Sequence, residues 1–366
     1  LARLLLQRGD AAAALRATQR GIACLRERGF ARTGFGQSQD IWWWHSRALA
    51  ALGRDDEAWA ALQQAQALML VSVRNLPDEG LRRSYLNKLQ VNRPLVPAWL
   101  AESARRGVAD AQRLEHLHLP SSLADPFKRL VDSGLRLNQL RSEAALHDFL
   151  VDEVTELSGA ERVLLVLQGA DGRHIAGALL PAGEDAAALL QTVSPWLDEA
   201  AATQEPRLRH GPEGVAEEDQ RSCLVAPLVA QGELLGHLYA DIEGAFGRFH
   251  DADRDLLAML AGQAAVAMAN LRFAGGLEAQ VAERTAEARS AQANAEQRAG
   301  ELAVINSIQQ GMAAKLDIQG IVDLVGDKLR EVFGTGDLGI HWIDREALQF
   351  SFLYQYVRGK RVYPRP

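Results

Sequence analysis

The sequence predicts a multidomain chain: all-α helical hairpins, an α+β domain with a central antiparallel sheet, a long coiled-coil helix, and part of a second α+β domain. Three observations predict this order. Helical periodicity fills residues 1–120, four short strand-like runs alternate with helical patterns in 127–273, and 302–366 repeats the opening of that pattern. Residues 274–301 are expected to form the connecting helix.

Composition limits the class of protein. The 366 residues are enough for two or three domains, and 48% hydrophobic with 24% charged residues is a globular balance. Residues 1–120 hold 17 Lys and Arg against 11 Asp and Glu, whereas the remainder holds 23 against 36. Such a split can mark a nucleic-acid surface. Because the basic residues are scattered along helical patterns, we expect no nucleic-acid partner and favour attraction between two parts of the chain.

Cysteine content and hydropathy predict the compartment. Cys24 and Cys223 lie in different predicted domains, so no disulfide framework is expected and a reducing cytoplasm fits. No signal peptide is visible. The longest apolar helical run, Leu256–Met268, falls short of the roughly 18–20 residues that span a bilayer, so no membrane contact is expected. The chain begins inside a helical pattern and stops just after strand-like sequence, which predicts a piece of a longer protein.

The N-terminal helices contain two similar junctions, at Gly9 and Gly53. Each glycine follows an amphipathic run and precedes an acidic residue, which is typical of a helix stop and a new start. This pattern resembles tetratricopeptide-type hairpins, although the junctions lie 44 residues apart instead of about 34. Trp42, Trp43 and Trp44 cannot all face one side of a helix. They predict either core packing between helices or an aromatic patch that binds a protein partner.

The α+β domain alternates helices and strands. Gly159 ends its first helix, and Asp171 with Gly172 predicts a hairpin turn. The closing helix reaches Phe273, and helices are expected to cover one face of the sheet. The expected elements between these points are strands 162–167 and 175–180, a short helix 184–192, a proline-containing loop 194–214, and strands 224–230 and 234–241.

The last strand of this domain predicts a pocket. One face, with Leu234, Gly236, Leu238 and Ala240, is small and apolar and suits packing against helices; the other carries Leu235, His237, Tyr239 and Asp241, a mixed set typical of a ligand-pocket wall. Pro227 predicts an edge position or a bulge. The segment 195–221 is expected to cover the pocket. The candidate ligand-binding residues are Trp196, His210, Arg221, Cys223, His237 and Tyr239.

Each candidate also has a purely structural interpretation. His237 fits a core histidine, Cys223 fits a buried small apolar residue, and Arg221 fits a salt bridge. Both interpretations stay open at this point.

The order of elements, with Ser222–Leu228, Leu235–Asp241 and Phe249–Asp253 leading into an apolar helix, resembles the GAF family, small sensory modules of cytosolic signalling proteins. The resemblance covers about 150 residues, 127–273. The Asn-Lys, Phe, Asp-Glu signature of its cyclic-nucleotide-binding members is absent. Cys223 lies in a strand, whereas chromophore-binding members attach through a loop or helix cysteine. The ligand and any cofactor are therefore unknown, and a pocket filled by side chains is the alternative.

The connecting helix predicts a weak coiled coil. Steps of four and three from Leu277 place apolar residues at seven of ten positions, but three of the seven are alanine. Such a seam can shift at small cost, which suits signal transmission; a solvated single helix is the alternative. The segment 278–287 resembles signalling helices between sensor and output domains. Residues 302–366, with strands 338–343 and 349–357, resemble the start of a second GAF domain.

Catalytic signatures are missing from the sequence. We find no phosphate loop, dinucleotide-binding glycine triplet or nucleophile elbow. His116 and His118 are too isolated for a metal site and predict a solvated helix end. We therefore expect no catalysis by this chain. The resemblance implies a sensor fragment of a bacterial-type signalling protein, homodimeric through its helices, whose output domain is a nucleotide cyclase or histidine kinase. The alternative is a scaffold whose helical repeats bind a protein partner and whose GAF domain only dimerises.

Overall fold

The computed structural model describes residues 1–27, 38–76, 78–120, 122, 124–169, 172–314 and 317–362. They fall into two compact units, Leu1–Ala274 and Gly275–Pro366, which are described separately. Asp171 of the expected hairpin turn and residues 363–366 lie outside the described residues.

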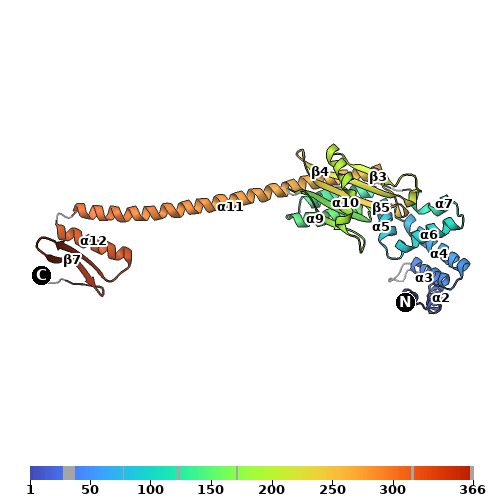
Figure 1. Cartoon of the computed structure of the whole chain (residues 1–366), viewed down its shortest axis with the longest axis horizontal. Helices are drawn as coiled ribbons and strands as arrows, with labels where there is room; N and C mark the ends of the chain where they lie inside the picture. The colour runs from blue at the N-terminus through green and yellow to red at the C-terminus, as the bar shows by residue number, and fades with distance from the viewer. Residues whose placement is uncertain are drawn as a thin grey trace. The chain divides into compact units, whose positions relative to one another are not determined.

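The N-terminal part of the first unit is helical, as expected. Gly9 and Gly53 adopt positive φ angles of 79° and 71° between consecutive helices. The helices are α1 (Ala2–Gln7), α2 (Ala11–Glu27), α3 (Ser38–Ala51), α4 (Asp55–Arg74), α5 (Glu79–Lys88), α6 (Asn92–Arg105) and α7 (Asp110–Arg113) (Figure 1).

The tryptophans of this region pack inside it. Trp43 is 5% exposed and belongs to the main hydrophobic core, and Trp42 and Trp44 pack against it. Trp59 and Trp99 stack with their ring centroids 5.2 Å apart and their planes at 6°. The core-packing interpretation is therefore confirmed for Trp43.

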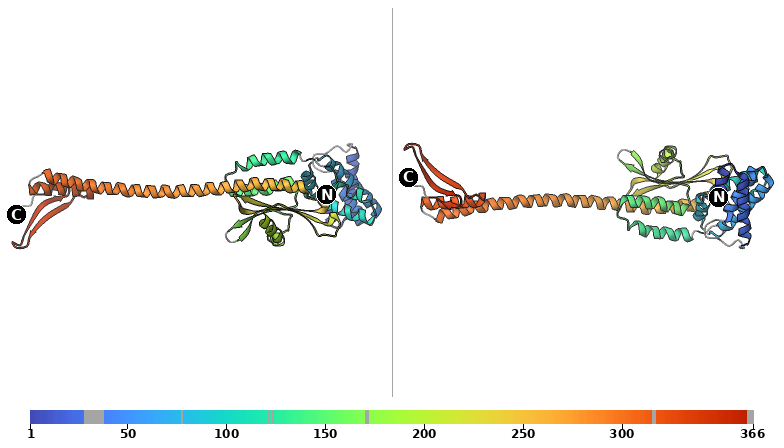
Figure 2. Two further views of the ribbon diagram at one scale, coloured as in Figure 1. Left: turned by 90° about the horizontal axis from the view of Figure 1, so that it is seen from above. Right: turned by 90° about the horizontal axis from the view of Figure 1, so that it is seen from below.

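A five-stranded antiparallel sheet forms the centre of the α+β domain, in the order β2-β1-β5-β4-β3. Helices α8 and α9 and the start of α11 cover one face, and α10 covers the other (Figure 2). The elements are α8 (Ala124–Leu137), α9 (Glu143–Ser158), β1 (Arg162–Gly169), β2 (Gly172–Leu179), α10 (Ala186–Thr203), β3 (Arg207–Gly211), β4 (Arg221–Ala230), β5 (Glu233–Glu243) and α11 (Asp251–Ala314).

Alternation along β5 places Leu238, Ala240 and Tyr239 on the expected faces, but Leu235, expected on the cavity face, belongs to the opposite core because the β4–β5 register shifts next to it. Leu238 and Ala240 pack into the core under α9 and α11, whereas Tyr239 packs with α10. Pro227 of β4 also meets its expectation. β3 pairs with β4 only up to Val225, so β4 is an edge strand at Pro227, and the register shifts between Leu228 and Val229.

The segment 184–214 corrects the sequence prediction. The expected short helix is α10, which continues through Pro195 to Thr203, and the expected loop contains a fifth strand, β3. Proline removes one helical hydrogen bond. However, buried Leu189, Val193 and Leu197 recur at helical spacing on both sides of Pro195. Burial of this apolar face outweighs the lost bond.

The second unit holds the rest of α11 and a small sheet. Residues 272–303 of α11 are exposed throughout, so a coiled coil there requires a second helix. Helix α11 runs without a break through Gly275 and Gly276. It is followed by α12 (Ile318–Phe333) and a three-stranded sheet of β6 (Leu338–Asp344), β7 (Gln349–Val357) and β8 (Lys360–Arg361).

Helix α11 meets a length and hydropathy criterion for a membrane span that, from the sequence, no helix was expected to meet. Residues 251–311 are long and apolar enough, by length and composition alone, to cross a membrane. The apolar window is 44% buried within the protein, and Leu257, Leu260 and Ala264 belong to the domain core. A core helix passes the same test, so this finding is weak evidence for a membrane span.

Candidate functional site

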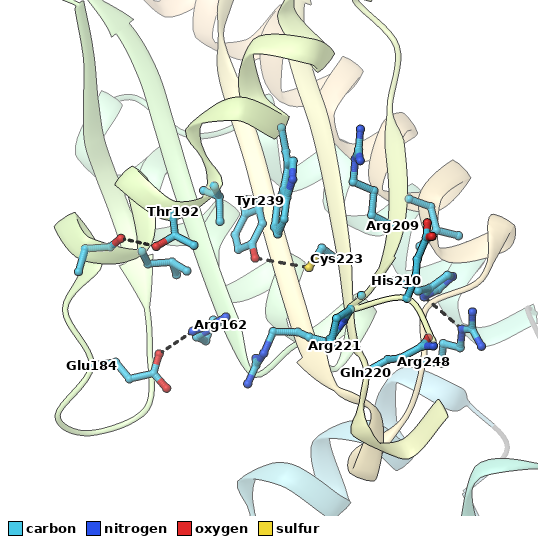
Figure 3. A pocket seen from close by; sticks show the side chains of 18 of the residues that line it. Arg162, Glu184, Thr192, Arg209, His210, Gln220, Arg221, Cys223, Tyr239 and Arg248 are labelled. Carbon is cyan, nitrogen blue, oxygen red and sulfur yellow. Dashed lines mark hydrogen bonds and ion pairs between the residues drawn. The ribbon is translucent and has the colours of Figure 1, made fainter. Parts of the chain in front are cut away.

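A cavity of about 1070 Å³ lies between α10 and the sheet, next to the edge strand β3. Its apolar wall comes from α10, with Leu189 and Val193, and its sheet wall contains Cys223 and Tyr239. Figure 3 shows Arg162 and Glu184 on one side of Tyr239, with His210 and Arg248 on the other. The cavity therefore has an aromatic and aliphatic centre between two charged ends, an arrangement that suits a small organic ligand.

Five of the six sequence-predicted residues line this cavity. They are Trp196, His210, Arg221, Cys223 and Tyr239. Trp196 comes from α10 and His210 from β3, not from a covering loop. Sequence reasoning missed Arg162, Arg209 and Arg248. Arg162 and Arg248 lie at the edges of motifs that were recognised, at the start of the first strand and next to Phe249, but nothing local indicates which side chains face the cavity.

A buried carboxylate organises one end of the cavity. Asp241 has no exposed surface and accepts hydrogen bonds from Arg162 Nη2 at 2.7 Å and Arg221 Nη1 at 2.6 Å. Arg221 also contacts Glu161 and Glu243, and Arg162 contacts Glu184 at 3.2 Å. Charge-assisted bonds of this kind are strong and hold both arginines in place. The salt-bridge interpretation of Arg221 is thus confirmed.

Aromatic rings form the centre of the cavity wall. Trp196 stacks near Tyr239, with ring centroids 6.5 Å apart and planes at 22°. The Tyr239 hydroxyl donates a hydrogen bond to the Asp241 carboxylate. Burial and the negative charge of Asp241 raise the pKa of Tyr239 far above its ordinary value, so this hydroxyl stays protonated. The phenol therefore acts as a fixed donor.

His210 and Arg248 form the other end. Arg248 Nε donates to His210 Nδ1 at 3.1 Å, and Arg248 Nη1 lies 3.1 Å from Glu217. Burial and the neighbouring Arg248 lower the pKa of His210, so the ring is neutral at pH 7. Because Nδ1 accepts from an arginine N–H, the ring proton lies on Nε2. His210 can thus donate one hydrogen bond from Nε2.

The comparison with family models decides the identity of this domain. The model described as GAF domain matches residues 145–268. Residues 145–268 form a GAF domain. This module is typical of sensory and regulatory parts of signalling proteins. No curated protein matches the chain.

Solved structures resemble this GAF domain at low identity. The GAF domain of the cyanobacteriochrome TePixJ is 21% identical, over 37% of this chain and 95% of its own, with a TM-score of 0.30. The GAF domain/HD domain protein from Geobacter sulfurreducens is 15% identical, over 38% and 99%, with a TM-score of 0.31. The GAF domain of a phosphoenolpyruvate-protein phosphotransferase from Coxiella burnetii is 19% identical, over 43% and 99%, with a TM-score of 0.31.

His237 does not line the cavity of the GAF domain. Its side chain is fully buried beside the Leu197 backbone of α10, and neither ring nitrogen reaches a partner in good hydrogen-bond geometry. Burial lowers its pKa to about 4, so the ring is neutral at pH 7. His237 is therefore a core histidine in this structure, but not a satisfied one.

Metal ligation has no support among the described residues. They contain no group of three or more His, Cys, Asp or Glu side chains placed to hold a metal ion. His116, expected at a solvated helix end, is instead 3% exposed and bonds through Nε2 to the Ala245 carbonyl at 3.0 Å. The sequence missed this because Ala245 lies 129 residues away.

Cys223 is expected to resist thiol reagents, whereas Cys24 reacts. Both are free cysteines, but Cys24 is exposed and Cys223 is 4% exposed. Burial and the nearby Asp241 raise the pKa of the Cys223 thiol to about 11, so almost no thiolate forms at pH 8. Iodoacetamide at pH 8, followed by peptide mass spectrometry, should modify Cys24 alone. Equal labelling of both in the native protein, with labelling in urea as the full-reaction control, would contradict the buried placement.

Proposed function

We propose that this chain is the regulatory part of a cytoplasmic, bacterial-type signal-transduction protein. Its GAF domain binds a small ligand in the cavity and transmits the change through α11 to an adenylate or guanylate cyclase or a histidine kinase output domain. The observation that supports this proposal is the cavity of about 1070 Å³ with an aromatic centre and charged ends. The chain itself catalyses nothing in this proposal.

The proposal includes a tandem arrangement. In the GAF domain, α9 ends at Gly159 with a φ of 67° and β1 follows; in the second unit, α12 ends at Gly334 with a φ of 57° and β6 follows. In both places an antiparallel strand pair comes next. We therefore assign residues 302–366 to the opening part of a second GAF domain, and residues 1–120 to tetratricopeptide-like hairpins. The exposed apolar positions of α11, such as Leu277 and Val281, suit a homodimeric coiled coil.

Native mass spectrometry of the full chain as purified from cells tests the sensor. We expect a bound small molecule in the wild type. Ala188→Trp should abolish it, because Ala188 lines the cavity and indole fills the space. Ala187→Trp is the matched control, since Ala187 is the residue before Ala188 in α10, is exposed and lies outside the lining. A clean apo protein in all three samples would overturn ligand sensing.

The second candidate is a scaffold without a ligand. It is favoured by the ion pairs of the cavity arginines: Arg162 with Asp241, Arg209 with Glu199, and Arg248 with Glu217. A cavity whose charges are already compensated needs no anionic ligand. In that case the N-terminal helices bind a protein partner and the GAF domain serves dimerisation. The apo result described above would support this function.

A further inference from the structure

Arg83 of α5 is buried against the GAF domain. Its side chain is 1% exposed, and its guanidinium makes a two-pronged contact with Asp253, Nη1 to Oδ1 at 2.8 Å and Nη2 to Oδ2 at 2.9 Å. The same group donates to the Ser158 carbonyl at 3.1 Å and lies over the Phe249 ring at 5.1 Å. A buried charge with this many specific partners fixes the position of each of them.

The segment that contacts Arg83 joins the sheet to α11. Gly247 has a φ of 144°, and a Cβ at that position would lie 2.8 Å from Arg83 Cγ. Only glycine therefore lets the chain pass this close. Asp253 lies in the first turn of α11 and also accepts from the His250 backbone N–H at 2.8 Å. Arg83 thus contacts both the entry to α11 and its first turn.

Arg248 connects this contact to the cavity. Its carbonyl accepts from Arg83 Nη2 at 2.5 Å. Its side chain lies at the charged end of the cavity, bonded to His210 of β3 and paired with Glu217. One residue therefore contacts the N-terminal helices through its backbone and the ligand cavity through its side chain. Because these bonds are direct and the site is closely packed, this geometry is one that can couple the two places.

We propose that the N-terminal helices regulate the GAF cavity and the start of α11 through Arg83. A force or partner that moves α5 shifts residues 247–253, which displaces Arg248 at the cavity and Asp253 at the head of α11. Conversely, a ligand that draws Arg248 from His210 pulls on Arg83 and α5, as linkage requires. This regulation rests on the proposed function, since it takes the cavity as the ligand site and α11 as the output.

Hydrogen exchange on the full chain without added ligand tests the coupling. In Arg83→Gln we expect exchange at least about tenfold faster in β3 (207–211) and in the first turns of α11, because local opening there becomes easier. Strand β2, at the opposite edge of the same sheet, should keep its wild-type rate. Arg83→Lys keeps the positive charge but cannot make the two-pronged contact with Asp253, so it should give a smaller increase in exchange in the same segments. It replaces Arg83→Gln if that variant does not fold.

Arg82→Gln is the matched control. Arg82 is the neighbouring arginine of α5, is 6% exposed, and donates to the backbone carbonyls of Leu76, Leu119 and Pro120. It should leave exchange in β3 within about twofold of wild type. Unchanged exchange in β3 in Arg83→Gln, or an equal rise in β2, overturns the coupling. If native mass spectrometry finds no ligand but Arg83→Gln still exchanges faster in β3, only the proposed function is overturned. If a ligand is found but exchange in β3 is unchanged, only this inference is overturned.

Discussion

Asp241→Asn is expected to destabilise the folded protein by about 3–5 kcal/mol, the cost of removing the central, fully buried anion that two arginines share. Asp241 is fully buried and binds Arg162, Arg221 and the Tyr239 hydroxyl. Asparagine has nearly the same shape but no charge, so two guanidinium groups lose their shared partner. Urea unfolding at pH 7.5, followed by tryptophan fluorescence and circular dichroism, measures the change in the unfolding free energy.

Glu243→Gln is the matched control for this prediction. Glu243 lies two residues further along β5 and pairs with the same Arg221 at 2.6 Å, but its side chain is 48% exposed. An exposed pair contributes about 1 kcal/mol or less, so this variant should remain close to wild type. Equal losses in the two variants would mean that burial of Asp241 does not determine the energetics at this end of the cavity.

The sequence predicted the parts of the GAF domain that depend on local patterns. Alternation predicted the faces of Leu238, Tyr239 and Ala240, because neighbouring residues of a strand face opposite sides, but not that of Leu235, beside which the register shifts. Apolar spacing predicted the closing helix. The prediction was wrong at α10 and β3, where Pro195 suggested a loop. In that segment, packing of α10 on the sheet determines the structure, and packing is not visible in a local window.

The contacts of the site were less predictable than its wall. Tyr239 was found because strand alternation predicts which face of its strand it occupies, and Cys223 was found as a residue of the neighbouring predicted strand. The charged partners were not found, since Arg162 and Asp241 are 79 residues apart and Arg83 and Asp253 are 170 apart. Such pairs depend on the tertiary fold, and one sequence gives no measure of distance in space. His237 was misplaced for a related reason: it shares a strand face with Tyr239, but it is fully buried beside Leu197 of α10.

Acidification is expected to destabilise the protein through two buried histidines, by about 2 kcal/mol for each between pH 7.5 and 5. Burial lowers the pKa of both His237 and His116 to about 4. In the unfolded chain a histidine has a pKa of about 6.5. As the pH falls through 6.5, the unfolded state therefore binds protons that the folded state cannot accept until about pH 4. The stability present above pH 6.5 is lost over this interval.

His237→Leu separates this effect from general acid unfolding. Neither ring nitrogen of His237 has a partner in good hydrogen-bond geometry, and only the Leu197 backbone lies close, so leucine removes a titrating group at little hydrogen-bond cost. Urea unfolding at pH 7.5 and 5 should show a pH-dependent loss about 2 kcal/mol smaller than in wild type. His116→Leu should reduce the loss by a similar amount but also lower stability at pH 7.5, because it removes the bond to Ala245. The two histidines share no partner, so each substitution should show its own effect. A wild-type pH dependence of the unfolding free energy in both variants would therefore show that other groups control the acid response.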